Sequence, residues 1–365
     1  MELRQKNPKF NRAIYTYGEK ILDHKIDNSS GAEQVTFIKD LVKLWEERAV
    51  HFASKTPKGT YMAKSCQLQY DYRKELSMSD LQLFKCFDEA YKTDAKTFTN
   101  PKALYTYFKL AVNLYDSGAK PAAELFTKYD EISEKVEDEV KNYTNKVNQL
   151  ISEHAKEEDM TSKEKKRRGS YTSYLKAYDQ IASGMDKDLG DRANCTNLIP
   201  LYMKNYDANK NDGLWLQRAM NRLYTKDCAD DPLFIKIVQQ KNNLEPNAST
   251  AYYLGILKDK EGKSNEALTY YNQAVDLETD GYEKSRILYR IATSFKKKGS
   301  YGTARSYFRK ALSANPSMGR CHLAIASMYA SSANSCGTDT FSKRAVYWLA
   351  AQEAGKAGRV DPNLK

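Results

Sequence analysis

Apolar residues recur every three to four positions along nearly the whole chain, from residue 6 to residue 358. This spacing gives each successive segment one apolar stripe, as an amphipathic helix requires, whereas a strand would alternate apolar and polar residues. The pattern predicts sixteen helices joined by short turns, and it predicts no strand. Short connections favour antiparallel helix pairs, each of which needs neighbouring pairs to bury its apolar side.

Three of these helices carry clear start signals. Asn100 and Asp231 can each accept a hydrogen bond from a free backbone N–H group, and each is followed by proline at the first helical position. Thr161 and Glu164 have the spacing of a capping box, in which a hydroxyl and a carboxylate satisfy such groups reciprocally. Helices are therefore expected to begin at these three points.

A repeated pattern of small and bulky residues occupies the last third of the chain. Three successive sets match in order: Leu254-Gly255, Ala267, Tyr271 and Ala274; Ile291-Ala292, Ala304, Phe308 and Ala311; and Ile325-Ala326, Tyr329, Ala350, Ala354 and Ala357. The pattern resembles the tetratricopeptide repeat, a helix pair of about 34 residues. The resemblance covers about residues 248–362 and implies that Gly255 and Ala267 let two helices of one unit cross closely.

Towards the N-terminus the helix lengths persist but the small-residue pattern fades. The sequence as a whole predicts an all-α solenoid of antiparallel helix pairs, similar to a tetratricopeptide superhelix. We expect three regions: an N-terminal helical region with degenerate pairs at residues 1–158, further degenerate pairs at 159–247, and three clear units with a C-terminal helix at 248–365.

Composition and charge narrow the function classes. Hydrophobic residues make up 41% of the chain and charged residues 29%, and no run reaches the ~18 apolar residues of a membrane-spanning helix. The formal net charge is +11, but basic and acidic residues are interleaved, and the dense basic cluster is confined to Lys163–Arg168. Nucleic acid is therefore not the expected partner. A basic surface that holds a polyanion, such as nucleic acid or a cell-envelope polymer, is the alternative.

The chain has six cysteines and four scattered histidines, without a CxxC motif, so no metal site is predicted. The expected helix ends allow three pairs of sequence neighbours: Cys66 with Cys86, Cys195 with Cys228, and Cys321 with Cys336. Disulfides would indicate an extracytoplasmic compartment, and the repeats resemble those of exported Gram-negative tetratricopeptide proteins, which implies the periplasm. No signal peptide is recognised in the first residues. The alternative is a cytoplasmic protein in which Cys66, Cys86 and Cys321 are small core residues.

Catalytic motifs are absent from the sequence: it contains no GxSxG, HExxH, P-loop or GxGxxG pattern. We therefore predict no catalytic residue, no cofactor and no enzymatic activity. A solenoid of helix pairs instead presents a concave groove lined mainly by its first helices. Positions 2, 5, 6 and 9 of the clear first helices are expected to face this groove. They include a set of aromatic and basic residues: Tyr252, Tyr253, Arg286, Tyr289, Arg290 and Arg320.

Arginine forks can pair with carboxylates, and tyrosine rings supply contact area. The groove is therefore expected to bind a partner polypeptide, with an acidic segment as the favoured ligand. The alternative is that Tyr252 and Tyr289 pack between repeats and that the arginines pair with nearby carboxylates. The Lys/Asn/Arg clamp with which some members of the family hold a terminal carboxylate is not reproduced, because Tyr, Arg and Thr stand where asparagines are needed.

Overall fold

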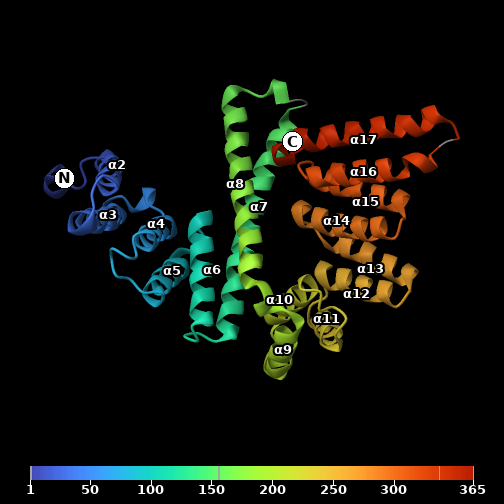
Figure 1. The fold of residues 1–365 in the computed structure, drawn as a ribbon, viewed down its shortest axis with the longest axis horizontal. Helices are drawn as coiled ribbons and strands as arrows, with labels where there is room; N and C mark the ends of the chain where they lie inside the picture. The colour runs from blue at the N-terminus through green and yellow to red at the C-terminus, as the bar shows by residue number, and fades with distance from the viewer. Residues whose placement is uncertain (1, 155–156, 337, 365) are drawn as a thin grey trace. The chain divides into compact units, whose positions relative to one another are not determined.

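The computed structural model describes residues 2–154, 157–336 and 338–364, and in these residues the fold is helical, without a strand (Figure 1). The all-α prediction is therefore confirmed. The α-helices of the described residues are α1 Glu2–Lys6, α2 Ala13–Asp27, α3 Gly31–His51, α4 Lys58–Asp71, α5 Asp80–Asp94, α6 Pro101–Asp116, α7 Ala122–Glu153, α8 Ser162–Leu189, α9 Cys195–Asn209, α10 Gly213–Thr225, α11 Pro232–Leu244, α12 Ala248–Lys260, α13 Ser264–Leu277, α14 Gly281–Lys297, α15 Tyr301–Ala314, α16 Gly319–Ser332 and α17 Thr340–Val360. Short 3-10 helices lie at η1 Ala53–Lys55, η2 Glu157–Asp159, η3 Gly190–Ala193, η4 Ala333–Ser335 and η5 Pro362–Leu364.

The sixteen expected helices correspond to α2–α17, and α1 is additional. The first helix was expected from residue 6, but α1 ends at Lys6 and α2 begins at Ala13. Pro8 lies between them and has no backbone N–H with which to continue a helix. Its carbonyl oxygen instead accepts a hydrogen bond from the Tyr15 hydroxyl at 3.2 Å.

The predicted helix starts are present. The side chains of Asn100 and Asp231 accept hydrogen bonds from backbone N–H groups of the first turns of α6 and α11, at 3.0 and 2.8 Å. At the start of α8, the Glu164 carboxylate accepts from the backbone N–H of Thr161 at 2.8 Å, and the Thr161 hydroxyl oxygen accepts from the backbone N–H of Glu164 at 3.3 Å. These contacts satisfy donors that the first turn of a helix leaves free.

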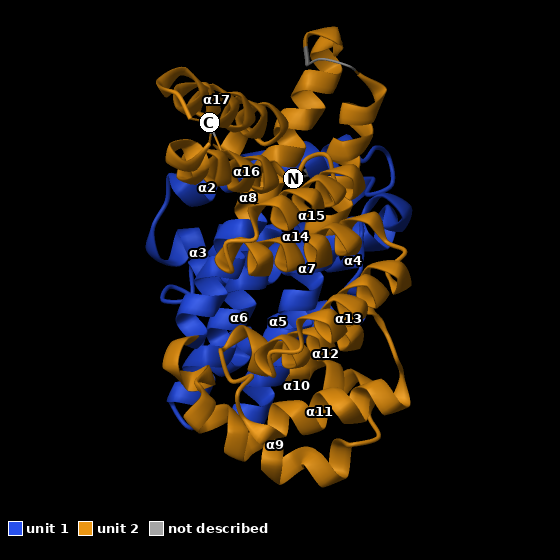
Figure 2. Ribbon diagram, turned by 90° about the vertical axis from the view of Figure 1, so that its right-hand side faces the viewer, with its two compact units in different colours: residues 1–139, 178–189 blue, residues 140–177, 190–365 orange. Residues whose placement is uncertain are grey.

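The chain divides into two compact units, which Figure 2 shows in different colours. Unit 1 comprises Met1–Glu139 and Tyr178–Leu189, and unit 2 comprises Val140–Ala177 and Gly190–Lys365. The chain thus passes from unit 1 to unit 2 within α7, returns to unit 1 within α8, and enters unit 2 again after Leu189. Of the expected region boundaries, the one after residue 158 lies in η2 and the one after residue 247 lies at the start of α12, both within unit 2.

Unit 1 has an apolar core between α2 and α3. Tyr15 and Leu22 of α2 and Leu44 of α3 are completely buried. Gly18 permits this approach, because a Cβ atom on it would lie 2.7 Å from Cδ1 of Leu44. Any larger residue at this position would require the Leu44 side chain to shift.

The C-terminal part of α8 completes unit 1. Tyr178 is fully buried, and its hydroxyl donates a hydrogen bond to the carbonyl oxygen of Thr99. Near the C-terminal end of α8, the hydroxyl of Tyr105 donates a hydrogen bond to the carboxylate of Asp188 at 2.7 Å. Residues 178–189 therefore belong to the packing of unit 1, although about forty residues separate them from the rest of it.

Unit 1 also contains a charged network. The carboxylate of Asp88 in α5 accepts hydrogen bonds from the buried Tyr107 hydroxyl and lies 2.8 Å from the ammonium nitrogen of Lys128 and 2.6 Å from that of Lys92. Burial opposes ionisation of Asp88, but the hydrogen bonds from Lys128, Lys92 and Tyr107 outweigh it and lower its pKa to about 2. The network links α5, α6 and α7.

Unit 2 contains a stack of helix pairs (Figure 1). The pairs are α10 with α11, α12 with α13, α14 with α15, and α16 with α17. Successive pairs contact each other through α11 and α12, α13 and α14, and α15 and α16. Each pair thus covers the apolar side of the next, which is how a solenoid is stabilised.

Small residues stand where these helices approach most closely. A Cβ atom on Gly255 of α12 would lie 2.6 Å from the ring of Tyr271 and 3.2 Å from the carbonyl oxygen of Ala267, both in α13. Ala267 and Ala274 are themselves almost completely buried. The repeated glycine and alanine positions are therefore packing positions rather than chemical ones.

Candidate partner-binding groove

An open hollow of about 410 Å³ lies on the first helices of the stack in unit 2. It is lined by Tyr224 of α10, by residues of α12 from Tyr252 to Lys260, by Tyr271 of α13, by residues of α14 from Tyr289 to Lys297, and by Lys298, which follows α14. These first helices were expected to form a concave face, and the hollow lies on them. We refer to it below as the α10–α14 hollow.

Four tyrosines form much of the wall. The hydroxyl oxygens of Tyr224 and Tyr252 lie 3.2 Å apart, and the Tyr271 hydroxyl donates to the carboxylate of Asp259 at 2.9 Å. Burial raises the pKa of Tyr252 and of Tyr271, and the hydrogen bond to Asp259 raises the latter further. Tyr252 and Tyr271 therefore stay neutral, and the four tyrosines offer ring surface to a ligand.

Positive charge dominates the polar part of the lining. The lining contains one carboxylate, that of Asp259, and four cationic side chains: Lys260, Arg290, Lys297 and Lys298. The Lys298 ammonium nitrogen lies 2.7 Å from Asp259, and that of Lys260 lies 2.6 Å from the exposed Asp230. Within the described part of the chain, neither Arg290 nor Lys297 forms an ion pair.

The Arg290 guanidinium is held against aromatic rings. Its central carbon lies 5.8 Å from the ring centroid of Tyr252, a cation–π contact that fixes the side chain without neutralising its charge. Lys297 follows seven residues later on the same helix, two turns along, and is exposed. The hollow can therefore offer two uncompensated positive charges to a ligand.

Some of the residues expected in the groove line this hollow, and others do not. Tyr252, Tyr289 and Arg290 line it. So do Ile256 and Thr293, which occupy position 9 of their helices. Positions 5 and 9 of α12 and positions 5, 6 and 9 of α14 thus line the hollow.

Tyr253, Arg286 and Arg320 do not line the hollow. The Tyr253 side chain is directed into the stack, where its hydroxyl donates to Asn221 at 3.0 Å. Position 6 of α12 is thus used for packing inside the stack, whereas position 6 of α14, Arg290, lines the hollow.

Two of the expected arginines are used in other ways. The Arg286 guanidinium lies 3.4 Å from the carboxylate of Glu283, one turn earlier on α14. Arg320 lies over the ring of Tyr289, with its guanidinium 4.5 Å from the ring centroid. The local pairing that the sequence left open as an alternative thus describes Arg286.

Sequence reasoning missed the cationic end of the hollow. Lys260 ends α12, Lys297 ends α14 and Lys298 directly follows, beyond the positions that the repeat pattern assigns to the groove. The available signal was the helical spacing. Lys260 lies one turn beyond Ile256 on α12, and Lys297 lies two turns beyond Arg290 on α14, each on the same helix face. Asp259 and Tyr271 could not be recognised, because their contact joins two helices.

Two of the three expected cysteine pairs lie at disulfide distance. The Cα atoms of Cys66 and Cys86 are 5.8 Å apart, and those of Cys195 and Cys228 are 5.5 Å apart. The first bond joins α4 to α5, and the second joins the start of α9 to the turn after α10. Both lie between neighbouring helices, as the expected antiparallel arrangement required.

The third expected pairing, Cys321 with Cys336, is wrong. Both are free thiols, Cys321 buried and Cys336 exposed. Cys321 lies near the start of α16, and the helix rises about 1.5 Å per residue, so its end at Ser332 lies about 16 Å away. The inserted segment continues into η4 instead of folding back, and the Cα atoms of a disulfide lie within about 7 Å.

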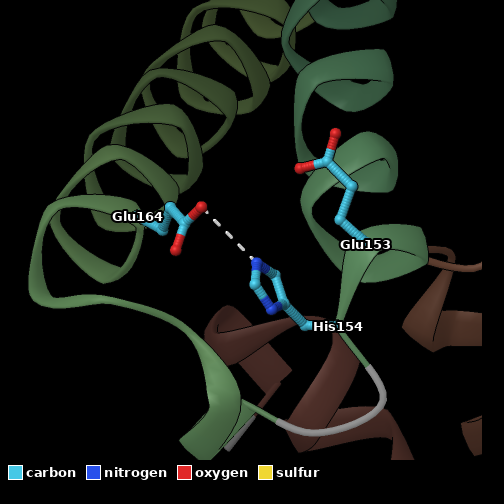
Figure 3. A group of neighbouring side chains, drawn as sticks. All are labelled: Glu153, His154 and Glu164. Carbon is cyan, nitrogen blue, oxygen red and sulfur yellow. Dashed lines mark ion pairs between the residues drawn. The ribbon is translucent and has the colours of Figure 1, made fainter.

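A small cluster of ligand-type side chains lies where α7 ends and α8 begins (Figure 3). Ligand atoms of Glu153, His154 and Glu164 lie within 4.8 Å of one another. Nε2 of His154 is 3.5 Å from one oxygen of Glu164, whose other oxygen caps α8 through Thr161. Glu153 accepts a hydrogen bond from Gln149 at 2.8 Å. These contacts are those of a helix cap and an ion pair.

No helix in the described parts of the chain is both long enough and apolar enough to cross a membrane.

Comparison with known proteins agrees with the repeat pattern. Residues 285–318, which cover most of α14 and all of α15, match the family model described as tetratricopeptide repeat. The photosystem I assembly protein Ycf3 of Cuscuta gronovii is 40% identical over 67 residues, which are 18% of this chain and 40% of that protein. The chain thus spans less than half the length of the curated relative that it matches.

Two solved structures match the chain at low sequence identity. MamA has a TM-score of 0.28 at 16% identity, over 56% of this chain and 96% of that one. Human IFIT1 has a TM-score of 0.36 at 13% identity, over 93% of this chain and 70% of that one. Neither score indicates a shared overall arrangement. The repeat match at residues 285–318, the similarity to Ycf3 and the stacked helix pairs of unit 2 together show that this part of the chain contains a tetratricopeptide repeat.

Proposed function

We propose that the protein is a non-enzymatic interaction scaffold whose α10–α14 hollow binds an acidic segment of a partner polypeptide. The observation that carries the proposal is the composition of the lining, which contains four cationic side chains and four tyrosines but a single carboxylate. Carboxylates of a partner would meet Arg290 and Lys297, which have no ion-pair partner among the described residues. The rings of Tyr252 and Tyr289 would supply contact area.

The lining suits binding better than catalysis. It contains no histidine or cysteine, and its one carboxylate, Asp259, is already occupied by Lys298 and Tyr271. A general acid or base needs a group with an accessible proton and a pKa near neutrality. Of the lining tyrosines, Tyr252 and Tyr271 have pKa values raised by burial, which takes them further from neutrality. A scaffold role is also supported by the matched relative, which is named as an assembly protein.

We further propose that the protein works in an oxidising compartment outside the cytoplasm, in keeping with the resemblance to exported Gram-negative tetratricopeptide proteins. Two cysteine pairs at disulfide distance support this, because structural disulfides persist in such compartments and are rare in the cytosol. Intact mass of protein isolated from its native source, after alkylation without reduction, tests the proposal. Alkylation of all six cysteines would contradict it.

The groove proposal is tested with synthetic peptides rich in Glu and Asp and with matched peptides carrying Gln and Asn. Arg290→Glu combined with Lys297→Glu reverses both uncompensated charges. Each exposed ion pair contributes about 0.2–1 kcal/mol, so loss of attraction plus new repulsion should weaken binding by about tenfold. Fluorescence anisotropy should show this loss for the acidic peptides and weak binding of the amide peptides by every variant.

The matched control is Arg309→Glu combined with Lys310→Glu, which makes the same charge change on exposed residues of α15. It should bind the acidic peptides like the wild type. Equal weakening by both double variants would contradict the groove and would favour a general basic surface. A steep loss of affinity with salt for any polyanion, regardless of sequence, would identify the polyanion alternative.

A further inference from the structure

The α10–α14 hollow follows two helices that run in the same direction. These are α12 and α14, the first helices of neighbouring pairs in the stack (Figure 1). The chain reverses between α12 and α13 and again between α13 and α14, so α12 and α14 point the same way. Tyr252 and Tyr289 therefore lie towards one end of the hollow, and Lys260 and Lys297, each eight residues later, lie towards the other. A ligand chain that follows the hollow passes from aromatic rings to lysines.

Two positive charges stand on the α14 side at a spacing that the helix sets. Arg290 and Lys297 are seven residues apart, which places them on one side of α14 with their Cα atoms about 10.5 Å apart along its axis. Thr293 lies between them, and its hydroxyl donates to the carbonyl oxygen of Tyr289 within the same helix at 2.9 Å. The α14 side thus offers two positions for a carboxylate, separated by an uncharged stretch.

The α12 side is apolar between its ends. Ile256 lines the hollow one turn beyond Tyr252 and one turn before Lys260. The backbone N–H and C=O groups around Ile256 and Thr293 bond within their own helices. Neither side therefore has a free edge with which a ligand could pair as a β-strand. The hollow suits a segment that needs no main-chain hydrogen bonds from the protein.

The spacing of the two charges discriminates between ligand conformations. In a β-strand, residues on one side are two or four apart, at about 6.8 or 13.6 Å, and neither value matches. In an α-helix, residues seven apart match, but seven residues of a helix about 10 Å wide fill about 800 Å³, whereas the hollow holds about 410 Å³. A polyproline II helix has three residues per turn and a rise of about 3.1 Å, so residues three apart face the same side at about 9.3 Å.

We infer that the preferred ligand of the hollow is an acidic segment in the polyproline II conformation, with two carboxylates three residues apart and prolines between them. The inference rests on the proposed function and fixes the spacing and backbone of the acidic partner. One carboxylate pairs with Arg290 and the other with Lys297, while the prolines lie against Ile256 and the tyrosine rings. Aromatic-lined grooves suit this conformation, because it is formed before binding and loses little entropy.

Fluorescence anisotropy with synthetic peptides tests the inference. Four proline-rich peptides of equal length and charge carry two glutamates that are two, three, four or five residues apart. The peptide with a spacing of three should bind about two- to fivefold more tightly than the others, because it alone engages Arg290 and Lys297 together. The same peptide with glycine in place of each proline should bind more weakly, since its backbone loses more freedom on binding.

Substitutions in the protein show whether each carboxylate meets one cation. In the peptide with a spacing of three, replacing one glutamate by glutamine should weaken binding to the wild type but not to Arg290→Gln. Replacing the other should weaken binding to the wild type but not to Lys297→Gln. The control is Arg309→Gln, which changes an exposed residue of α15 and should bind every peptide like the wild type.

The outcomes that contradict the inference are distinct from those that contradict the proposed function. Equal affinity at every spacing, or tighter binding of the glycine peptide, would overturn the polyproline II arrangement. If Arg290→Glu with Lys297→Glu still weakened these peptides, acidic-segment binding in the hollow would stand. Peptides that bind no form of the protein, or that Arg309→Glu with Lys310→Glu weakens equally, would overturn both.

Discussion

Substitution of Gly255 by alanine is a direct test of the packing argument for the helix pairs. The added Cβ would lie 2.6 Å from two ring atoms of Tyr271 and 3.2 Å from the carbonyl oxygen of Ala267. Tyr271 has little freedom to move, since it is 1% exposed and its hydroxyl is bonded to Asp259. Overpacking a core costs about 1–3 kcal/mol, and this site falls at the upper end because backbone as well as ring must shift. The gain in helix propensity from glycine to alanine offsets about 1 kcal/mol.

Gly255→Ala should therefore lower the free energy of unfolding by about 1–2 kcal/mol. The control is Gly169→Ala in α8, where the added Cβ meets nothing within 4 Å and only the propensity gain of about 1 kcal/mol remains. Urea unfolding followed by circular dichroism at 222 nm measures both variants under the same conditions. A Gly255→Ala protein as stable as Gly169→Ala would refute the claim that close approach of α12 and α13 requires glycine.

Two further predictions concern groups with shifted pKa values. In the folded protein, iodoacetamide should modify Cys336 alone. Cys321 should react only after unfolding, because burial excludes the reagent and raises the pKa of the Cys321 thiol to about 12. An intact mass that shows two modifications of the native protein would contradict this. Asp88, with a folded-state pKa of about 2 against an ordinary 3.8, contributes stability that is present above pH 4 and lost as the pH falls towards 2. The difference in unfolding free energy between wild type and Asp88→Asn should thus shrink by about 2 kcal/mol between pH 5 and pH 2, as measured by urea unfolding. A difference that does not change with pH would show that the contacts with Lys128 and Tyr107 do not stabilise the Asp88 carboxylate.

Much of the fold could be predicted because its determinants are local. Apolar spacing located α2–α17, and caps such as Asn100 and Asp231 placed helix starts to within a residue or two. Gly255 and Ala267 indicated the close helix crossing, since residue size alone limits how near two backbones can come. The separate α1 was missed because one proline, Pro8, overrode an otherwise continuous helical pattern.

The residues that line the α10–α14 hollow could be predicted only in part, because the lining depends on how each helix is rotated in the stack. The repeat pattern assigned both Tyr252 and Tyr253 to the groove, yet Tyr253 is directed towards Asn221 inside the unit. The pairing of Lys298 with Asp259 joins α12 to the end of α14 and has no signature in either segment alone. The same limit applies to the Asp88 network, whose members come from three helices.

The discontinuous composition of unit 1 has a consequence for how the protein is made. Tyr178, which is fully buried in unit 1, leaves the ribosome only after some forty residues of unit 2 have been synthesised. Unit 1 therefore cannot finish folding in the order of translation, although N-terminal domains generally fold first. A gene fragment that stops at residue 139 should yield an incomplete core, and any dissection of the chain into halves must keep residues 178–189 with the N-terminal part.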